Sequence, residues 1–480
     1  MAMTAAFALC VRSTARTLPG VLNNLEALAG LYERCAFVFV EGDSADESKS
    51  LLKAWAAGRS DTTAIELDGL EARLPLRSER LAACRNAYIE VLKRPPLAAF
   101  DQLVVLDADE INQGPIDLEG FARARDWLAE QGAGGVFANS QPFYYDIWAL
   151  RHPQWCPQDF LDDIRRERDQ LGKAAAQQRF IYDRQIQIPK TADPIEVRSA
   201  FGGLAIYRMA DALGARYAGL TQAGREICEH VSFNQDLGRS GRGLYILPWL
   251  TIGAAQAGVT LPADRRTLIL TQGDRSCELI APANYKVGDR DLPALARWIG
   301  VEAPGTTAID VGAGIGESIA RLWLQGADLR FIAVEESLAR LKFLVANLAA
   351  LPDLLGGVEA VWRTVGRADP TSAAPGYLSP RQTTLEELVS TRGVPPERLS
   401  LLMLNTKASL AVIRDESAYL ERAQPVVWIR EAVWAPTDFA SGAWPYRAAI
   451  DGGGLALIPE RFAAALAALS ISSPGRAAEA

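Results

Sequence analysis

The sequence lacks any apolar run near the roughly 18 residues that a membrane-spanning helix needs. It also lacks a CxxC pair, and its six cysteines are widely spread, which favours a reduced, cytoplasmic chain. Positive charge is in deficit: 50 Lys and Arg against 58 Asp and Glu give a net charge of −8, which argues against a general nucleic-acid-binding surface. No basic segment precedes the first apolar run, "AAFALC", so we expect a strand there rather than a signal peptide.

The hydrophobic content of 49% and the charged content of 22% are those of a soluble globular protein, and 480 residues are too many for one ordinary core. In the first 250 residues or so, short apolar runs alternate with helical patterns, which predicts βαβ units and a largely parallel sheet. A second strand–loop–helix–strand series begins at "GTTAIDVGAGIGES". We therefore predict an α/β protein with domains at 1–258 and 259–470 and a disordered tail at 471–480.

Three acids follow a predicted buried strand within four positions, in "VVLDADE" at Val104 to Glu110. In open α/β sheets, ligands bind beyond the carboxyl ends of the strands. Asp107 and Asp109 are spaced so that both can face one ligand, and one or two carboxylates with a substrate diphosphate are a common arrangement for Mg²⁺ or Mn²⁺. The alternative role for such acids is an Asx turn or a helix cap.

Other motifs accompany these acids in a definite order: "VEGDS", "RLAACRNAYIEVL", "FGGLAIYR" and "CEHVSFN". Together with "FDQLVVLDADE", they resemble the bacterial GT-A-fold glycosyltransferases that build capsules, lipopolysaccharides and other surface glycans. The resemblance implies a Rossmann-like domain that binds a nucleotide sugar, with a metal held by Asp109, Asp107 and His230. The donor-binding residues that it implies are Glu41, Asp43, Arg80, Arg85, Asn86, Asp107, Gly202 and Gly203.

Each of these assignments has a structural alternative. Arg80 and Arg85 could present guanidinium forks to phosphate oxygens, or they could be solvated helix residues. His230 could complete the metal shell or be a hydrogen-bonded loop histidine. Gly202 and Gly203 could let the backbone approach a donor sugar or make a tight bend in the sheet.

The aromatic run "QPFYYDIWALRHP" is a candidate wall for the sugar acceptor, because sugars stack on aromatic rings. We select Tyr145 and Trp148 as acceptor-binding residues, with packing in the core as the alternative. A metal would neutralise the charge that develops as the sugar–phosphate bond breaks. An inverting enzyme would also need a carboxylate base, for which Glu229 and Asp146 are the candidates, and retention and inversion both stay open.

The second series contains a glycine-rich loop between a predicted strand and a predicted helix, in "TAIDVGAGIGES". Such glycines permit a tight turn, and an acid roughly 20 residues later can bind ribose hydroxyls. With "FIAVEES" and "TTLEEL", the segment resembles the FkbM family of methyltransferases over roughly residues 265–440. The resemblance implies a Rossmann-like class I methyltransferase domain. Its S-adenosylmethionine-binding residues would be Asp310, Gly312, Gly314, Gly316 and Glu335.

The second domain departs from its family at "LNTKASL". The family has an acidic "K-x-D-x-E-G-x-E" segment there, whereas this chain has Asn405, Lys407, Ala408 and Ser409. Losing those carboxylates would remove the groups that orient an acceptor or take its proton. The domain could therefore be an active methyltransferase or a degenerate, structural or regulatory partner.

Together, the two resemblances imply a metal-dependent glycosyltransferase that moves a sugar from a nucleotide-sugar donor to a glycan or lipid-linked glycan acceptor. The predicted cofactors are Mn²⁺ or Mg²⁺ and S-adenosylmethionine, and the C-terminal domain would O-methylate the glycan or serve as a non-catalytic docking module. A carbohydrate-binding scaffold without enzymatic activity is the alternative of another class. We expect a cytoplasmic protein with peripheral contact at the inner face of the membrane, and a homo-oligomer stays open.

Overall fold

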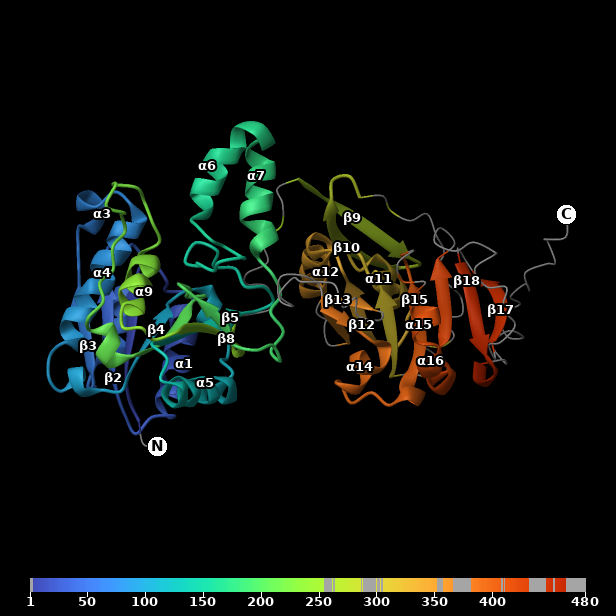
Figure 1. The fold of residues 1–480 in the computed structure, drawn as a ribbon, viewed down its shortest axis with the longest axis horizontal. Coiled ribbons are helices and arrows are strands. Elements are labelled where there is room, and N and C mark those ends of the chain that lie inside the picture. Colours follow the sequence, from blue (N-terminus) through green and yellow to red (C-terminus); the bar gives the residue numbers. More distant parts are fainter. Residues whose placement is uncertain are drawn as a thin grey trace. The chain divides into compact units, whose positions relative to one another are not determined.

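The computed structural model describes residues 3–253, 261, 264–285, 287, 299, 303, 305–351, 357–365, 381–406, 409, 411–430, 446–451 and 454–462. The chain divides into two compact units, Met1–Val259 and Thr260–Ala480, and each contains its own sheet with flanking helices (Figure 1). The mixed α/β class predicted from the sequence is therefore confirmed. The tail predicted at 471–480 and the stretch 254–260 around the predicted domain boundary lie outside the described residues.

The sheet of unit 1 has the strand order β3-β2-β1-β4-β7-β5-β8-β6. The pairs of β1 with β2 and with β4 are parallel, whereas β7 runs antiparallel to both β4 and β5. Helices cover the sheet, so the inner strands are buried and read as nearly continuous apolar runs. The strands are β1 (Thr4–Val11), β2 (Arg34–Glu41), β3 (Thr62–Glu66), β4 (Gln102–Asp107), β5 (Gly135–Ser140), β6 (Ile195–Val197), β7 (Leu204–Arg208) and β8 (Leu244–Ile252).

The helices of unit 1 follow the apolar spacing that buries one face. In α1, for example, Leu18, Val21, Leu25 and Leu28 recur at intervals of three and four residues and are all buried. The helices are α1 (Leu18–Ala29), α2 (Ser48–Ala56), α3 (Leu70–Arg73), α4 (Arg77–Leu92), α5 (Leu118–Gln131), α6 (Phe160–Leu171), α7 (Lys173–Phe180), α8 (Met209–Ala212) and α9 (Glu229–Gly238), with short 3₁₀ turns η1 (Leu97–Ala99), η2 (Glu110–Asn112) and η3 (Tyr182–Arg184).

Helices α6 and α7 form a hairpin that stands away from the sheet of unit 1 (Figure 1). The Asp159 carboxylate accepts a hydrogen bond from Leu161 N (2.9 Å) and caps α6. Gly172 lies between the two helices with φ of +82°, a conformation that favours glycine. The hairpin therefore begins at a side-chain cap and turns at a glycine.

The main sheet of unit 2 has the order β14-β13-β12-β11-β15-β16-β18-β17, and β9 and β10 form a separate antiparallel hairpin. No helix among the described residues is long and apolar enough to cross a membrane. The strands are β9 (Arg265–Gln272), β10 (Arg275–Pro282), β11 (Thr306–Val311), β12 (Leu329–Glu335), β13 (Val358–Val365), β14 (Arg381–Thr383), β15 (Leu399–Leu404), β16 (Val426–Arg430), β17 (Tyr446–Asp451) and β18 (Gly454–Pro459). The helical elements are α11 (Glu317–Leu324), α12 (Leu338–Ala350), α14 (Leu385–Ser390), η4 (Pro396–Arg398), α15 (Ala411–Asp415), α16 (Ser417–Ala423) and η8 (Glu460–Phe462).

Candidate functional site

The acids of "VVLDADE" lie where the strand order of unit 1 reverses. The chain passes from β1 outward to β2 and β3 on one side, and β4 lies on the other side of β1, so a crevice forms at the carboxyl ends of β1 and β4. Cys10 of β1 and Asp107 of β4 are register partners at that edge. Asp109 follows at the start of η2, and its Oδ1 accepts a hydrogen bond from Ile111 N (3.1 Å). Asp109 therefore caps η2 with its Oδ1. Its Oδ2 makes no hydrogen bond within the described part of the chain.

The electrostatics of this edge favour a cation. Burial and the nearby charge of Asp107 raise the pKa of Asp109 to about 7. Asp107 is bonded to the buried Arg85 (3.1 Å), but Arg85 is shared with Glu229 (3.0 Å), so one guanidinium serves two carboxylates. A divalent ion beside Asp107 and Asp109 would relieve their mutual repulsion with the oxygen ligands that Mg²⁺ and Mn²⁺ prefer. The two aspartates thus fit a divalent cation.

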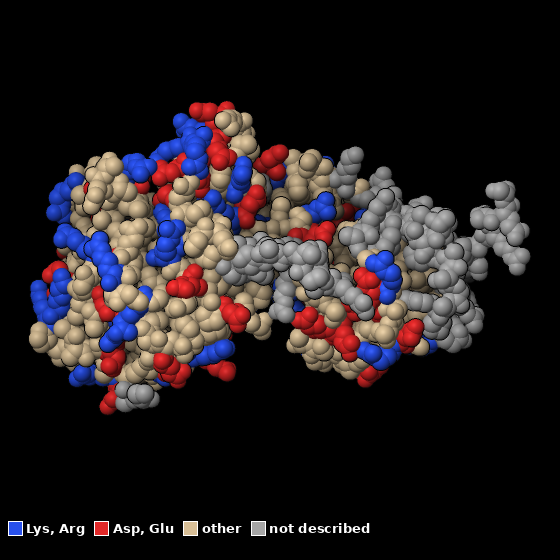
Figure 2. Space-filling view, in the orientation of Figure 1, with Lys and Arg blue, Asp and Glu red and all other residues tan. Residues whose placement is uncertain are grey.

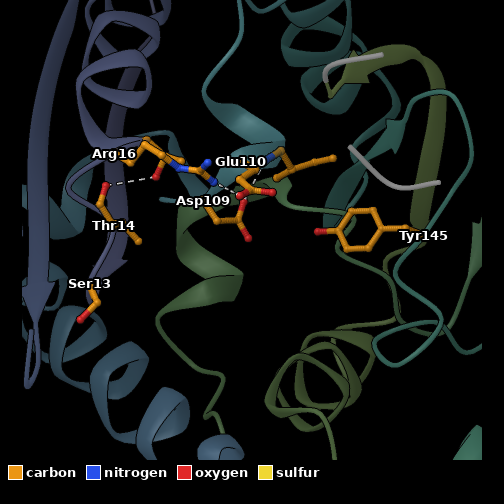
Figure 3. Close-up of a pocket in the computed structure, with 8 residues that line it drawn as sticks. Ser13, Thr14, Arg16, Asp109, Glu110 and Tyr145 are labelled. Carbon is orange, nitrogen blue, oxygen red and sulfur yellow. Dashed lines mark hydrogen bonds and ion pairs between the residues drawn. The ribbon is translucent and has the colours of Figure 1, made fainter. Parts of the chain in front are cut away.

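Asp109 lines three cavities, which we name after one residue of each. The Cys84 cavity (about 250 Å³) lies among β1, the end of β2 and the start of α4. The His230 cavity (about 320 Å³) extends toward Trp148, Phe201 and α9. The Ser13 cavity (about 390 Å³) lies between the β1–α1 loop and Tyr145, with Asp109 and Glu110 between them (Figure 3). The Asp109 side chain therefore lies where the three cavities adjoin.

His230 lies deep in the His230 cavity, where its ring stacks on Phe201 with centroids 3.8 Å apart. Burial and the Arg85 charge lower the pKa of His230, so the imidazole is neutral, and neither ring nitrogen has a hydrogen-bond partner. Its Nε2 lies 3.7 Å from Glu229 Oε1. Within the described ranges no three His, Cys, Asp or Glu side chains are grouped to hold a metal ion. Asp107, Asp109 and His230 thus line one cavity, but they do not form such a group among these residues.

Two of the predicted donor residues are acids used within loops. Glu41 is buried at the end of β2 and accepts a hydrogen bond from Ser44 N (2.9 Å), and it does not line the three cavities. Asp43 lines the Cys84 cavity, but both its carboxylate oxygens accept backbone hydrogen bonds at α3, from Gly69 N (2.6 Å) and Glu71 N (2.8 Å). Its φ of +54° is a left-handed conformation that is uncommon outside glycine.

The three predicted residues of α4 have different surroundings. Arg85 is inside the site, as described above. Arg80 lines the Cys84 cavity while its Nη1 donates to Leu74 O (2.8 Å) and Pro75 O (2.7 Å). Asn86 points elsewhere: its side-chain amide donates to Tyr217 O (2.9 Å) and accepts from Tyr217 N (3.0 Å), which ties α4 to the loop before α9.

The predicted glycines make a tight bend beside the site. Gly202 and Gly203 have φ values of +69° and +94°, and an added Cβ would lie 2.7 Å from Ala138 O or from Ile111 Cγ2, respectively. Gly203 O accepts a hydrogen bond from Asp107 N (3.0 Å), which fixes the start of the acidic turn. Their role in this structure is therefore to let β7 close against β4 and β5.

The predicted acceptor residues gather on the far wall of the His230 cavity. Tyr145 lines both the Ser13 and the His230 cavities, and Trp148 lines the latter with a buried Nε1–H that has no partner. Asp146 accepts hydrogen bonds from Gly202 N (3.0 Å) and Ala149 N (3.2 Å), and burial raises its pKa to about 6. Glu229, the other predicted base, is occupied by Arg85. Asp146 is thus the carboxylate without a cationic partner.

Sequence reasoning missed a cation and a thiol pair. Arg77, at the first position of α4, lines the Cys84 and His230 cavities. Its charge partly offsets the rise in the pKa of Asp109, and it has no ion-pair partner among the described side chains. The sequence feature that could have indicated Arg77 is its place with Arg80 and Arg85 on one predicted helix. Cys10 and Cys84 also line the Cys84 cavity, and their side chains interact. Residues that are far apart in sequence gave no sign of this contact.

In unit 2, the predicted glycine loop lies between β11 and α11, at the point where the strand order reverses between β11 and β15. Gly312, Gly314 and Gly316 have φ values of +78°, +62° and +87°, which explains why glycine is needed at each position. Glu335, at the end of β12, accepts hydrogen bonds from Gly314 N (2.7 Å) and Ser337 N (2.8 Å). The loop is therefore held against the end of β12 by a carboxylate.

Asp310 and Asn405 form a buried polar pair at the ends of β11 and β15. The Asn405 side-chain amide donates to Asp310 Oδ1, while Asp310 Oδ2 and Asn405 Oδ1 have no hydrogen-bond partner. Burial raises the pKa of Asp310 to about 7. Ser409 is buried and donates to Thr406 O (2.5 Å), whereas 407 and 408, where the sequence also departs from the acidic pattern, lie outside the described residues.

No known family matches this sequence, and no curated protein matches it either. Among solved structures, it is similar to the mannosyltransferase PcManGT from Pyrobaculum calidifontis in complex with GDP-Man and Mn²⁺, with 17% identity, 53% of this chain and 58% of that chain covered, and a TM-score of 0.31. It is also similar to S. aureus TarS 1–349 in complex with UDP-GlcNAc (12% identity, 52% and 57% covered, TM-score 0.30). A third is glucosyl-3-phosphoglycerate synthase from Mycobacterium tuberculosis with Mn²⁺, UDP-glucose and phosphoglyceric acid (14%, 52% and 71%, TM-score 0.28). The chain thus spans less than two thirds of the first two, and these likenesses do not define its family.

Proposed function

We propose that unit 1 is a metal-dependent glycosyltransferase that takes its sugar from a nucleotide-sugar donor. The observation that carries the proposal is the Asp107–Asp109 pair at the strand-order reversal. The Arg85 guanidinium alone does not balance these two close carboxylates, and Asp109 lines three cavities. Mn²⁺ or Mg²⁺ held by these aspartates would supply Lewis-acid stabilisation of the charge on the leaving diphosphate.

Each part of a donor finds matching side chains. Leu70 and Leu81 give the Cys84 cavity apolar walls suited to a base, and Arg77 at the boundary with the His230 cavity offers a free cation to a phosphate. Arg85 holds Asp107 in place through a buried guanidinium. Asp146, whose raised pKa of about 6 lies closer to neutrality than that of an ordinary Asp, is the carboxylate that can take a proton from an acceptor hydroxyl.

The acceptor in this proposal is a glycan or a lipid-linked glycan of surface polysaccharide synthesis, bound from the cytoplasmic side. Tyr145 and the unpartnered Trp148 Nε1–H support an acceptor with hydroxyl groups, because both line the His230 cavity, which Asp109 also lines. Neutral His230 would be one further polar group available there.

The test is nucleotide-sugar hydrolysis with and without Mn²⁺, in the wild type and in Asp109→Ala. A metal contributes several kcal/mol to such a transition state, so we expect a loss of about 100-fold or more on chelation and in the variant. Glu119→Ala, an exposed acid at the start of α5, is the matched control and should keep full activity. Hydrolysis that ignores both the chelator and the Asp109 substitution would refute the proposal.

For unit 2, we propose binding of S-adenosylmethionine at the glycine loop. Two buried acceptor atoms without partners, Asp310 Oδ2 and Asn405 Oδ1, carry this proposal, because an ammonium group would satisfy both. Glu335, at the end of the neighbouring strand, supports the proposal, because a carboxylate in this position can also accept hydrogen bonds from ribose hydroxyls. The missing carboxylates at Asn405 and Ser409 argue for a binding or docking module rather than for O-methylation of the glycan.

Titration calorimetry of the full chain with S-adenosylmethionine tests this second proposal. We expect binding in the wild type and a loss of at least about tenfold in Glu335→Ala, equal to one charge-assisted hydrogen bond of about 1.5 kcal/mol. Glu359→Ala, an exposed acid on β13, is the control. Absence of binding in the wild type would leave unit 2 as a docking module, and absence of donor binding as well would favour a carbohydrate-binding scaffold.

A further inference from the structure

Helix α4 lines a further cavity with the side that faces away from the candidate site. Arg77, Leu81, Cys84 and Arg85 of this helix line the cavities around Asp109. Because an α-helix turns once in about 3.6 residues, the residues at 83, 86, 87, 90 and 93 project from its other side. Those residues line a groove of about 880 Å³, which we call the Lys93 groove.

The Lys93 groove has an apolar floor and a fixed wall. Leu67 and Leu74 and the small side chains of Ala83 and Ala87 form the floor, and the wall is the segment 214–216. This wall is held in place because the backbone N–H and C=O of the next residue, Tyr217, both form hydrogen bonds with the Asn86 side chain. The groove is therefore a built concavity of unit 1.

The rim of the groove is basic. Arg73, Lys93 and Arg216 are exposed, and Glu90 is the single acid among the lining residues, so the lining carries +3 − 1 = +2 in a chain whose net charge is −8. Lys93 forms an exposed ion pair with Glu90 (2.6 Å), and this contact, followed by the charges of Arg216 and Arg94, lowers the pKa of Glu90. Figure 2 shows Lys and Arg side chains gathered over the part of unit 1 that carries α3 and α4 in Figure 1.

An exposed leucine lies three residues after Arg73. Leu76, in the segment between α3 and α4, is 36% exposed and belongs to the few large apolar side chains of the described chain that water reaches to this extent. Leu74, two residues earlier, lines the groove. Apolar side chains next to Lys and Arg are the pattern of proteins that bind a membrane surface, where the leucines enter the boundary of the acyl region and the cations stay at the phosphates.

We infer that the Lys93 groove and Leu76 form a docking surface for an anionic lipid bilayer. Arg73, Lys93 and Arg216 meet lipid phosphates, and the exposed Leu76 inserts near Arg73. The inference does not depend on the proposed function. It places a membrane on the side of α4 that faces away from the Asp109 cavities, which leaves those cavities open.

Vesicle co-sedimentation of the full chain tests the inference, with phosphatidylcholine alone and with phosphatidylcholine plus phosphatidylglycerol. We expect binding only to the anionic vesicles, weakening as salt rises. Each Lys or Arg near an anionic surface contributes about 1 kcal/mol, or about fivefold, so Arg73→Glu, Lys93→Glu and Arg216→Glu together should weaken binding by at least about 100-fold. Leu76→Ser should weaken it by about tenfold.

Matched controls come from the hairpin α6–α7. Arg168→Glu reverses an exposed charge there, and Leu171→Ser removes a leucine of similar exposure (40%); each should change binding by less than about twofold. Thermal unfolding of every variant checks the fold. Equal binding to neutral vesicles, undiminished binding by the triple variant, or burial of the groove in a dimer that does not bind vesicles would each overturn the inference.

Discussion

Arg85 shows what a single buried charge does for this site. It is 2% exposed, is bonded to Asp107 and Glu229, and lies with its guanidinium carbon 5.2 Å from the centre of the Phe201 ring. Removing one partner of a buried pair leaves an uncompensated charge, at a cost of about 3–5 kcal/mol. Glu229 therefore helps to keep Arg85, and through it Asp107, in position.

The Cys84 thiol should be the most reactive cysteine of unit 1. Its interaction with Cys10, and then the Arg85 charge, lower its pKa, whereas burial raises the pKa of Cys35 to about 11. Because the thiolate is the nucleophile, iodoacetamide at neutral pH should modify Cys84 at least about tenfold faster than Cys35, as peptide mass spectrometry would show. A nucleotide sugar with Mn²⁺ should protect Cys84, which lines the Cys84 cavity; equal rates in the absence of ligand would contradict the assignment.

Asp310 should make the stability of unit 2 depend on pH. Its folded-state pKa is raised from 3.8 to about 7 by burial, so the protonated form is favoured in the folded state. This contribution is fully present below pH 4 or so and is lost as the pH rises to about 7, by up to about 4 kcal/mol at 1.4 kcal/mol per pKa unit. Urea unfolding between these pH values should therefore show falling stability for unit 2, and Asp310→Asn should flatten that slope. A wild-type slope of the opposite sign would refute this explanation.

At the scale of elements, the strands of unit 1 were predictable because buried strands read as continuous apolar runs. "FALCV", "FVFVE" and "LVVLD" became β1, β2 and β4, and their carboxyl ends meet at the crevice that the βαβ pattern implied. Helix α6 gave no such signal, because its sequence "FLDDIRRERDQL" has eight charged or amide side chains and buries only Asp163. A helix of this kind is fixed by tertiary contacts rather than by an apolar stripe.

The directions of side chains were not predictable. The resemblance implied that Asn86 lies near the donor, yet its amide forms hydrogen bonds with Tyr217, 131 residues further along the chain. Arg85 and Glu229 are 144 residues apart, so no local spacing could pair them. A helix position fixes which face a residue occupies, and the partner across the interface decides what its polar atoms do.

The loop before α9 contacts the start of α4 at one glycine. A Cβ added at Gly219 would lie 2.4 Å from both Glu79 N and Ser78 C, so Gly219→Ala must push the loop away from the first turn of α4. We expect a loss of stability of about 1–3 kcal/mol, the usual cost of overpacking, and a raised KM for the donor because Arg77 lies in the same turn. Gly224→Ala, with open space around its Cβ but a φ of +72°, separates backbone strain from this steric effect.

An unchanged donor KM in Gly219→Ala, with unchanged stability, would contradict this contact. Loss of stability alone would show that the first turn of α4 tolerates displacement without effect on the donor. The two measurements therefore distinguish packing from the positioning of Arg77.

At the scale of the whole molecule, each unit has an apolar core of its own. One cluster contains only residues of unit 1, from Met3 to Ile252, and two others contain only residues of unit 2. Units with separate cores can unfold in separate transitions, and a ligand stabilises only the unit that binds it.

Differential scanning calorimetry of the full chain should therefore show ligand-specific shifts. A nucleotide sugar with Mn²⁺ at about 100 times its Kd should stabilise the transition of unit 1 by about 2.7 kcal/mol and leave that of unit 2 in place, and S-adenosylmethionine should do the reverse. The variants Asp109→Ala and Glu335→Ala assign each transition, because each should reduce one shift and leave the other unchanged. A single transition that both ligands raise equally would mean that the units unfold together.

The position of Asp109 at the junction of three cavities has a consequence for the time course of turnover. Ligands that contact the same carboxylate do not bind independently of each other. By thermodynamic linkage, the factor by which a metal ion raises the affinity for the nucleotide equals the factor by which the nucleotide raises the affinity for the metal ion. If the ion and the spent nucleotide bind at Asp109 as proposed, each would slow the release of the other, so departure of the product, rather than bond breaking, should limit the turnover rate.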